Sequence, residues 1–140
     1  MRFAVASDED LPIVAHVVSK IRAAGNEVTA LPCAAWAEAS LAVAHAVAGG
    51  SADAGVVFCH TGTGVSIAAN KVNGVRAALC VDAETAAGAR KWNDANVLAL
   101  SLRLLTPASA DAIVEAWLGT GYSGTEGASL AAIGREEAGG

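Results

Sequence analysis

The architecture of this chain follows from the stretch Val56-Val57-Phe58-Cys59-His60-Thr61-Gly62-Thr63-Gly64-Val65-Ser66-Ile67-Ala68-Ala69-Asn70-Lys71. The residues up to Cys59 are apolar throughout, which is typical of a parallel strand buried on both faces. The small residues after His60 allow a sharp backbone turn, and the pattern that follows predicts a helix over residues 65–71. We therefore expect a buried strand over residues 55–59, a tight turn and a helix.

Strand and helix patterns alternate on both sides of this stretch. Short apolar runs predict four more strands, over residues 2–6, 27–31, 75–81 and 96–100. Helices are expected over residues 12–24, 35–48, 83–91, 109–118 and, more weakly, 126–135. This alternation predicts one α/β domain over residues 1–140, a three-layer, doubly wound (Rossmann-like) five-stranded parallel sheet. Residues 136–140 are expected to be frayed.

The composition excludes several classes of protein. A net charge of −5 with scattered basic residues argues against a nucleic-acid surface. Three cysteines without a CxxC spacing argue against a disulfide framework or a structural zinc site. Charged residues close to Met1 and the lack of an apolar run of about 18 residues predict a cytoplasmic chain without a signal peptide or membrane span. With 54% hydrophobic but only 4% aromatic residues, burial should continue across an oligomer interface.

Ligands bind beyond the carboxyl ends of the strands in sheets of this kind, which selects the loops at residues 7–10, 59–64, 82 and 101–103. Cys59 ends a strand, and the N–H groups of residues 60–64 with the following helix N-terminus form a nest for negative charge. A thiolate beside that nest would be stabilised, giving a base next to an oxyanion hole. A buried cysteine followed by ordinary turn glycines explains the same residues equally well.

Other glycine-loop motifs do not fit this stretch. The dinucleotide fingerprint needs a third glycine where Ile67 stands, and the phosphate-loop ending Gly-Lys-Ser/Thr is missing. A hydrolase nucleophile at Ser66 would lie inside the predicted helix, and no suitable histidine follows it.

The loop and the segments at residues 72–80, 93–100 and 111–122 resemble the core signature of the type B ribose-5-phosphate isomerase and galactose-6-phosphate isomerase family. The opening Ser7-Asp8 also matches it. The resemblance implies an aldose–ketose isomerase that needs no metal or cofactor and moves a proton between C1 and C2 through a cis-enediolate. It also implies a small sugar or sugar-phosphate-like substrate and a site assembled across a dimer interface, in a homodimer or a dimer of dimers.

The resemblance also assigns roles to residues. Cys59 would be the base, and Thr61 with the backbone of residues 60–64 would cradle the substrate oxygens. His60 replaces a family glycine and would act as an acid or base, unless it is a solvated loop residue. The complete set of expected site residues is Cys59, Thr61 and His60 for catalysis, and Asp8, Glu9, Gly62, Thr63, Gly64, Trp92, Asn93 and Arg103 for substrate binding.

The departures from the family concentrate at the ligand. Trp92 takes the place of the ring-opening histidine, Glu9 that of a second histidine, and Glu126 and Leu130 those of two phosphate-binding arginines. A phosphate needs cationic partners, so the substrate is expected to differ from ribose 5-phosphate unless independent drift explains the changes. The substrate would be an unphosphorylated sugar, an amino-bearing compound or a phosphate held by a partner chain.

Two alternatives to a self-sufficient isomerase remain. One is a non-catalytic relative that binds a small ligand. The other is one subunit of a heteromeric isomerase, because the cysteine-bearing subunit of galactose-6-phosphate isomerase also lacks the histidine and the arginines. Of the remaining notable residues, Trp36, Trp117, Cys33 and Cys80 are expected to pack in the interior.

Overall fold

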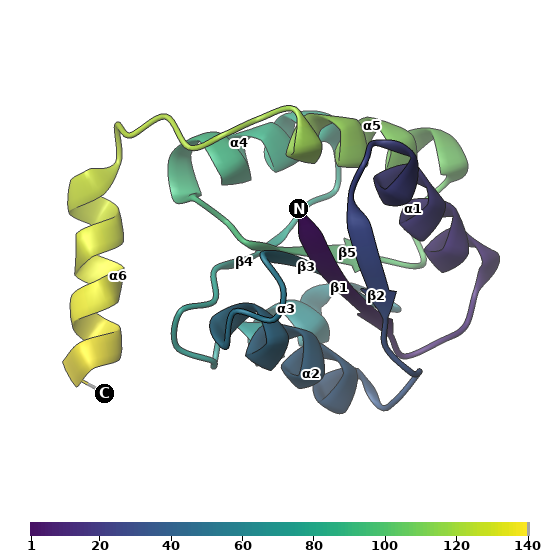
Figure 1. Cartoon of the computed structure of the whole chain (residues 1–140), viewed down its shortest axis with the longest axis horizontal. Coiled ribbons are helices and arrows are strands. Elements are labelled where there is room, and N and C mark those ends of the chain that lie inside the picture. Colours follow the sequence, from purple (N-terminus) through teal and green to yellow (C-terminus); the bar gives the residue numbers. More distant parts are fainter. Residues whose placement is uncertain (140) are drawn as a thin grey trace.

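Five parallel strands form one sheet in the order β2-β1-β3-β5-β4 (Figure 1). The computed structural model describes residues 1–139. The strands are β1 (Arg2–Ser7), β2 (Glu27–Ala30), β3 (Ala54–Cys59), β4 (Ala77–Leu79) and β5 (Val97–Ser101). The predicted single α/β domain with a five-stranded parallel sheet is confirmed.

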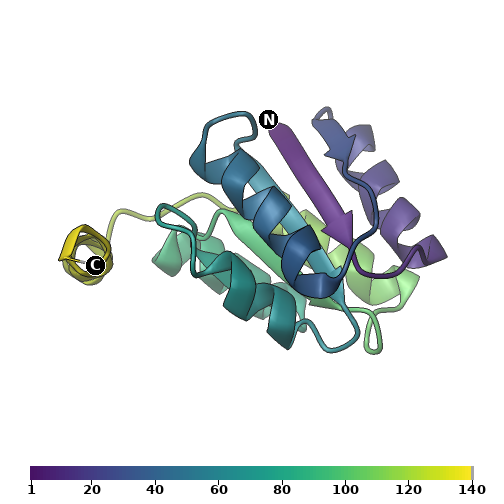
Figure 2. The same cartoon turned by 90° about the horizontal axis from the view of Figure 1, so that it is seen from below.

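Helices cover both faces of the sheet, as the doubly wound arrangement requires. The helices are α1 (Pro12–Ala23), α2 (Trp36–Ala48), α3 (Thr63–Ala69), α4 (Ala83–Asn93), α5 (Pro107–Leu118) and α6 (Gly127–Gly139). Figure 1 shows α1, α4 and α5 on one face and α2 and α3 on the other. The last helix, α6, stands apart from both layers at one end of the molecule (Figures 1 and 2), and none of its described residues is buried.

The core lies on both sides of β3, whose six residues are all buried. Val56 and Phe58 pack among the residues of α1, α4 and α5, whereas Val57 and Cys59 pack among those of α2 and α3. Burial of each large apolar side chain here stabilises the fold by about 1.5–3 kcal/mol. Cys59 is thus the last residue of a fully buried strand, so its backbone position is fixed by the core.

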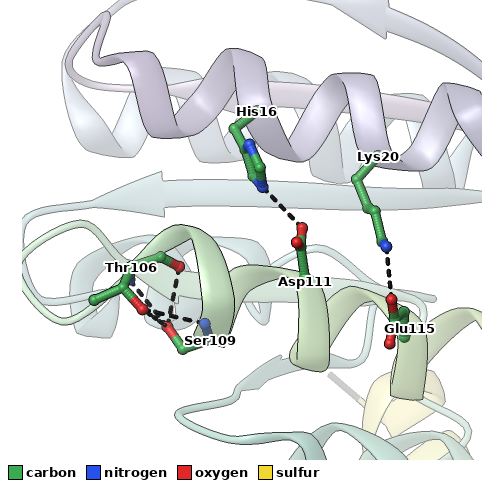
Figure 3. A network of polar contacts seen from close by, with 6 residues as sticks. All are labelled: His16, Lys20, Thr106, Ser109, Asp111 and Glu115. Carbon is green, nitrogen blue, oxygen red and sulfur yellow. Dashed lines mark hydrogen bonds and ion pairs between the residues drawn. The ribbon is translucent and has the colours of Figure 1, made fainter.

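Two ion pairs connect α1 to α5 (Figure 3). His16 Nε2 lies 2.8 Å from Asp111 Oδ1, and Lys20 Nζ donates to Glu115 Oε1 at 2.6 Å. The hydrogen bond that Lys20 donates to Glu115 raises the pKa of Lys20. Because all four side chains are partly exposed, these pairs contribute little to stability and mainly set the alignment of the two helices.

The element boundaries differ from the predicted ones for identifiable reasons. α5 begins at Pro107 and not at Ser109, because Thr106 and Ser109 form a reciprocal capping box. β4 is shorter than predicted, and the side chain of Asn70 bonds to both the N–H and the C=O of Ala77 at this sheet edge. α6 continues to Gly139, so residues 136–139 are helical where frayed residues were expected, and residue 140 lies outside the described residues.

Within residues 1–139, no helix combines the length and the apolar character needed to cross a lipid bilayer.

Candidate functional site

The order of the strands reverses between β1 and β3, and this point marks the crevice where doubly wound folds bind ligands. From β1 the chain passes to β2 on one side, whereas β4 and β5 lie beyond β3 on the other. Asp8 follows β1 directly and His60 follows β3. The Asp8 N–H donates to the Phe58 carbonyl at 3.3 Å, which holds the two loops together.

A shallow pocket of about 320 Å³ opens at this crevice, and we call it the Cys59 pocket. Its lining residues are Asp8, Trp36, Cys59, His60, Thr61, Thr63 and Gly64. All of them except Trp36 are among the site residues that the sequence predicted. Cys59 is 5% exposed, so its thiol lies at the floor of the pocket and not on the open surface.

The backbone conformation of Gly62 fixes the loop against the sheet. Its φ of 78° is in the left-handed region, and a Cβ there would lie 2.5 Å from Leu79 Cδ1 and 3.0 Å from the Leu100 carbonyl carbon. The residue is therefore pressed against β5, beneath the loop, and does not line the pocket. It is also the N-cap residue of α3, so that helix starts at Thr63, two residues earlier than predicted.

Hydrogen bonds from the end of β5 hold the loop in place. The Leu102 N–H donates to the Cys59 carbonyl at 2.9 Å, and the Ser101 hydroxyl donates to the His60 carbonyl at 3.0 Å. In the described part of the chain, the N–H groups of Thr61 and Gly62 donate to no protein acceptor. These two amides remain available to an oxygen, as the predicted nest for negative charge requires.

Asp8 supplies an unsatisfied acceptor to the same pocket. Its Oδ1 atom is buried and has no hydrogen-bond partner within residues 1–139. Buried polar atoms almost always have a partner. The Asp8 side chain lines the pocket, so a rotation of its carboxylate would present this oxygen to a ligand hydroxyl.

Glu9 and Arg103 flank the Cys59 pocket without lining it. Glu9 lines a separate hollow of about 300 Å³ together with Arg22 and Cys33. The Arg103 N–H donates to the His60 carbonyl at 3.0 Å, and its exposed side chain is not among the lining residues. The structure therefore places both residues near the site and gives neither a direct position in it.

Trp92 and Asn93 lie at the amino ends of the strands, on the other side of the sheet's length from the Cys59 pocket. They occupy the last turn of α4, which ends just before β5 begins. Together with Glu126 and Leu130 they line a groove of about 600 Å³ beside α6, which we call the Trp92 groove. One copy of the chain therefore does not bring the predicted site residues together. The residues expected to carry the proton transfer lie in the Cys59 pocket, whereas Trp92 and Asn93, which were expected to bind the substrate, lie in the Trp92 groove.

The Trp92 groove is acidic. Arg76 is the basic side chain among its described lining residues, which also include Glu126, Glu136 and Glu137. The guanidinium of Arg76 is already engaged, because its Nε donates to the Asp94 carbonyl at 2.7 Å and its Nη2 lies 3.5 Å from the Asp94 carboxylate. The groove thus offers no free arginine to a phosphate group.

Two packing predictions were wrong. Cys33 is exposed, and Trp36 is 47% exposed and lines the Cys59 pocket. Trp36 begins the helix that follows β2, at the carboxyl edge of the sheet, and this placement is the signal that could have identified it. Trp117 and Cys80 are buried as predicted, and burial raises the pKa of the Cys80 thiol to about 12.

The described residues contain no group of three or more His, Cys, Asp or Glu side chains placed to hold a metal ion.

Comparison with known proteins identifies the family. Residues 4–133 match the model of the Ribose/Galactose Isomerase family, and the chain belongs to this family. It is 39% identical to the type B ribose 5-phosphate isomerase of Trypanosoma brucei, whose structure superposes with a TM-score of 0.91 over 96% of this chain and 97% of that one.

Two curated relatives match shorter segments. Ribose-5-phosphate isomerase B of Escherichia coli is 50% identical over 82 residues, which are 59% of this chain and 55% of that protein. D-erythrulose-4-phosphate isomerase of Pectobacterium atrosepticum is 43% identical over 89 residues, which are 64% of this chain and 59% of that protein. The chain thus spans little more than half the length of the curated relatives it matches.

Proposed function

We propose that the chain is an aldose–ketose isomerase in which Cys59 is the base. The observation that supports this most directly is a strand-end thiol in one pocket with a loop whose Thr61 and Gly62 amides have no protein acceptor within residues 1–139. The thiolate would take the proton from C2 of the aldose, and the electron pair would move through the new C1–C2 double bond onto the carbonyl oxygen. The two amides would stabilise the resulting cis-enediolate.

The remaining proton transfers would use neighbouring groups. Returning the proton from the Cys59 thiol to C1 completes the conversion to the ketose. A proton must also pass between the two substrate oxygens. His60 lines the pocket and would carry it, because an imidazole both gives and takes protons near neutral pH. Thr61 and Thr63, whose hydroxyl oxygens lie 2.7 Å apart, would hydrogen-bond to the substrate oxygens.

The substrate is expected to differ from ribose 5-phosphate. Support comes from the acidic Trp92 groove, which Glu126 and Leu130 line. The sequence resemblance implies that these two residues stand where the family has phosphate-binding arginines. The two curated relatives are themselves named for different sugar phosphates. An unphosphorylated sugar, an amino-bearing compound or a phosphate held by a partner chain remain the candidate substrates.

Deuterium exchange tests this function. Incubation in deuterated water with a panel of aldoses and ketoses, with and without a terminal phosphate, should give deuterium at C1 or C2 of at least one compound, followed by its isomer. Nuclear magnetic resonance measures both. If the chain alone exchanges no compound of the panel, but exchange appears after a second family member is added, the enzyme is a heteromeric isomerase. Ligand binding without exchange in either case would favour the non-catalytic relative.

We further expect a homodimer or a dimer of dimers in solution. The two groups of site residues lie at opposite edges of the sheet of one copy, so they can meet only if a second copy brings its Trp92 groove to the Cys59 pocket. Trp92 is 49% and Ile133 46% exposed, and contact with a second copy would bury this apolar surface. Light scattering at micromolar concentration measures the mass, and a monomer would contradict both the assembly and the shared site.

A further inference from the structure

Trp36 packs directly on the loop that carries the proposed chemistry. A Cβ on Gly64 would lie 2.8 Å from Cε3 of the indole and 3.1 Å from Cδ2 and Cζ3. The ring is therefore in close contact with the backbone at Gly64, which only glycine permits without movement of the ring. At the same time the side chain is 47% exposed and lines the pocket that holds Cys59. Part of the indole thus faces whatever enters that pocket.

The position of the indole is held by the helix that carries it. Trp36 is the first residue of α2, and Ser40, one turn later, is fully buried and donates to the Val65 carbonyl at 2.6 Å. Val43, a further turn along, is also fully buried in the core. α2 is therefore fixed against the junction of the loop and α3. A ligand beside Cys59 meets a preformed aromatic wall, not a mobile surface side chain.

The same pocket also offers a polar group, which complements the aromatic surface of Trp36. Asp8 Oδ1 is buried and without a partner in the described residues, and it needs a donor. Among the described residues that line the pocket, His60 is the one basic side chain, and none is a lysine or an arginine. An aromatic face with a nearby carboxylate suits a carbon chain that presents C–H groups on one side and hydroxyl groups on the other.

We infer that Trp36 is a specificity-determining binding residue of the Cys59 pocket. Its indole packs against the carbon chain of an uncharged polyhydroxy segment of the substrate, while Asp8 accepts a hydrogen bond from one of the hydroxyl groups of that segment. This inference rests on the proposed isomerase function, since it specifies which part of the substrate lies beside Cys59. Trp36 has no proton-transfer group, so its contribution is to binding and orientation and not to the chemical step.

Calorimetry with D-erythronohydroxamate tests the inference. This compound is a neutral polyol whose hydroxamate resembles the enediolate, so binding can be measured without turnover. The wild-type protein should bind it, Trp36→Phe should bind about 2- to 5-fold more weakly, and Trp36→Ala at least about 10-fold more weakly. Glu38→Gln, an exposed change on the same helix, is the matched control and should bind like the wild type. Circular dichroism checks folding, and Trp36→Phe retains a ring if Trp36→Ala does not fold.

The outcomes separate this inference from the proposed function. Equal binding by the wild type and both folded Trp36 variants, or no binding by the wild type, would overturn the inference. Binding that depends on Trp36, without proton exchange on any sugar, would uphold the inference and contradict the isomerase. With an active substrate, the Trp36→Ala variant should raise KM at least about 10-fold while kcat changes far less, as expected for a binding residue. A fall in kcat alone would assign Trp36 a purely structural role in the loop.

Discussion

Replacement of Cys59 by alanine is expected to abolish proton exchange on the substrate, with a loss of at least about 1,000-fold in kcat. The variant lacks the thiol that we propose as the acceptor of the carbon-bound proton, while Asp8 and the loop amides remain. Folding should persist, because removal of one sulfur from a residue that keeps its Cβ leaves a small cavity. Cys59→Ser should also be severely impaired, since a serine hydroxyl ionises far less readily than a thiol near neutral pH.

The two other cysteines provide controls for this experiment. Cys33→Ala should retain full activity, because Cys33 is exposed and lies outside the Cys59 pocket. Iodoacetamide should label Cys33 freely and leave Cys80 unlabelled at mild pH, since burial raises the pKa of Cys80 to about 12. Labelling of Cys59, followed in a Cys33→Ser background, should be slowed by the substrate. A Cys59→Ala variant with full activity would instead assign the chemistry to His60 or Glu9.

Weak or absent activity on ribose 5-phosphate is the second large effect that we expect of the isolated chain. Each missing charge-assisted contact to the phosphate costs about 1.5–3 kcal/mol, so two missing arginines weaken binding by roughly 100- to 10,000-fold. The acidic groove adds repulsion, because Glu126, Glu136 and Glu137 line it. Steady-state kinetics should show no saturation at low millimolar substrate.

Introducing arginines at positions 126 and 130 tests the same prediction in the opposite direction. A chain with both Glu126→Arg and Leu130→Arg should recover most of the lost affinity for ribose 5-phosphate, because both side chains line the Trp92 groove. Glu126→Gln with Leu130→Gln is the matched control: it removes the carboxylate without adding a cation, and should recover much less. Efficient turnover of ribose 5-phosphate by the unmodified chain would show that its phosphate is held by other residues, with Arg103 as the first candidate.

Much of the fold could be predicted because it depends on local patterns. The uniformly apolar run before Cys59 became β3, and the glycines after it became the turn into α3. Helix boundaries were less accurate where a side-chain contact decides them, as in the capping box of Thr106 and Ser109. The position of α6, away from both helix layers, could not be predicted, because its sequence does not specify a surface against which it packs.

The candidate site was predictable where its residues are neighbours in the chain, and less so where they come from different elements. The residues of the loop that follows Cys59 were expected together, because they are adjacent in the chain. The separation of Trp92 from Cys59 follows from the direction of α4, which carries the chain back to the amino edge of the sheet. The exposure of Trp36 depends on how far around α2 the indole lies. Composition could not reveal this, because a tryptophan in an aromatic-poor chain is more often buried than exposed.

The division of the site between two edges of the sheet bears on how such a protein changes during evolution. The loop after Cys59 is tied to β5 by backbone hydrogen bonds and pressed against it at Gly62, so most substitutions there would disturb the core. One side of the Trp92 groove is formed by Trp92 at the end of α4 and by residues of α6, a helix in which none of the described side chains is buried. Substitutions on this side should affect folding much less than substitutions in the loop. Substitutions can therefore change the recognition of the far end of a ligand at little cost to folding, while substitutions in the loop beside Cys59 are constrained by the core.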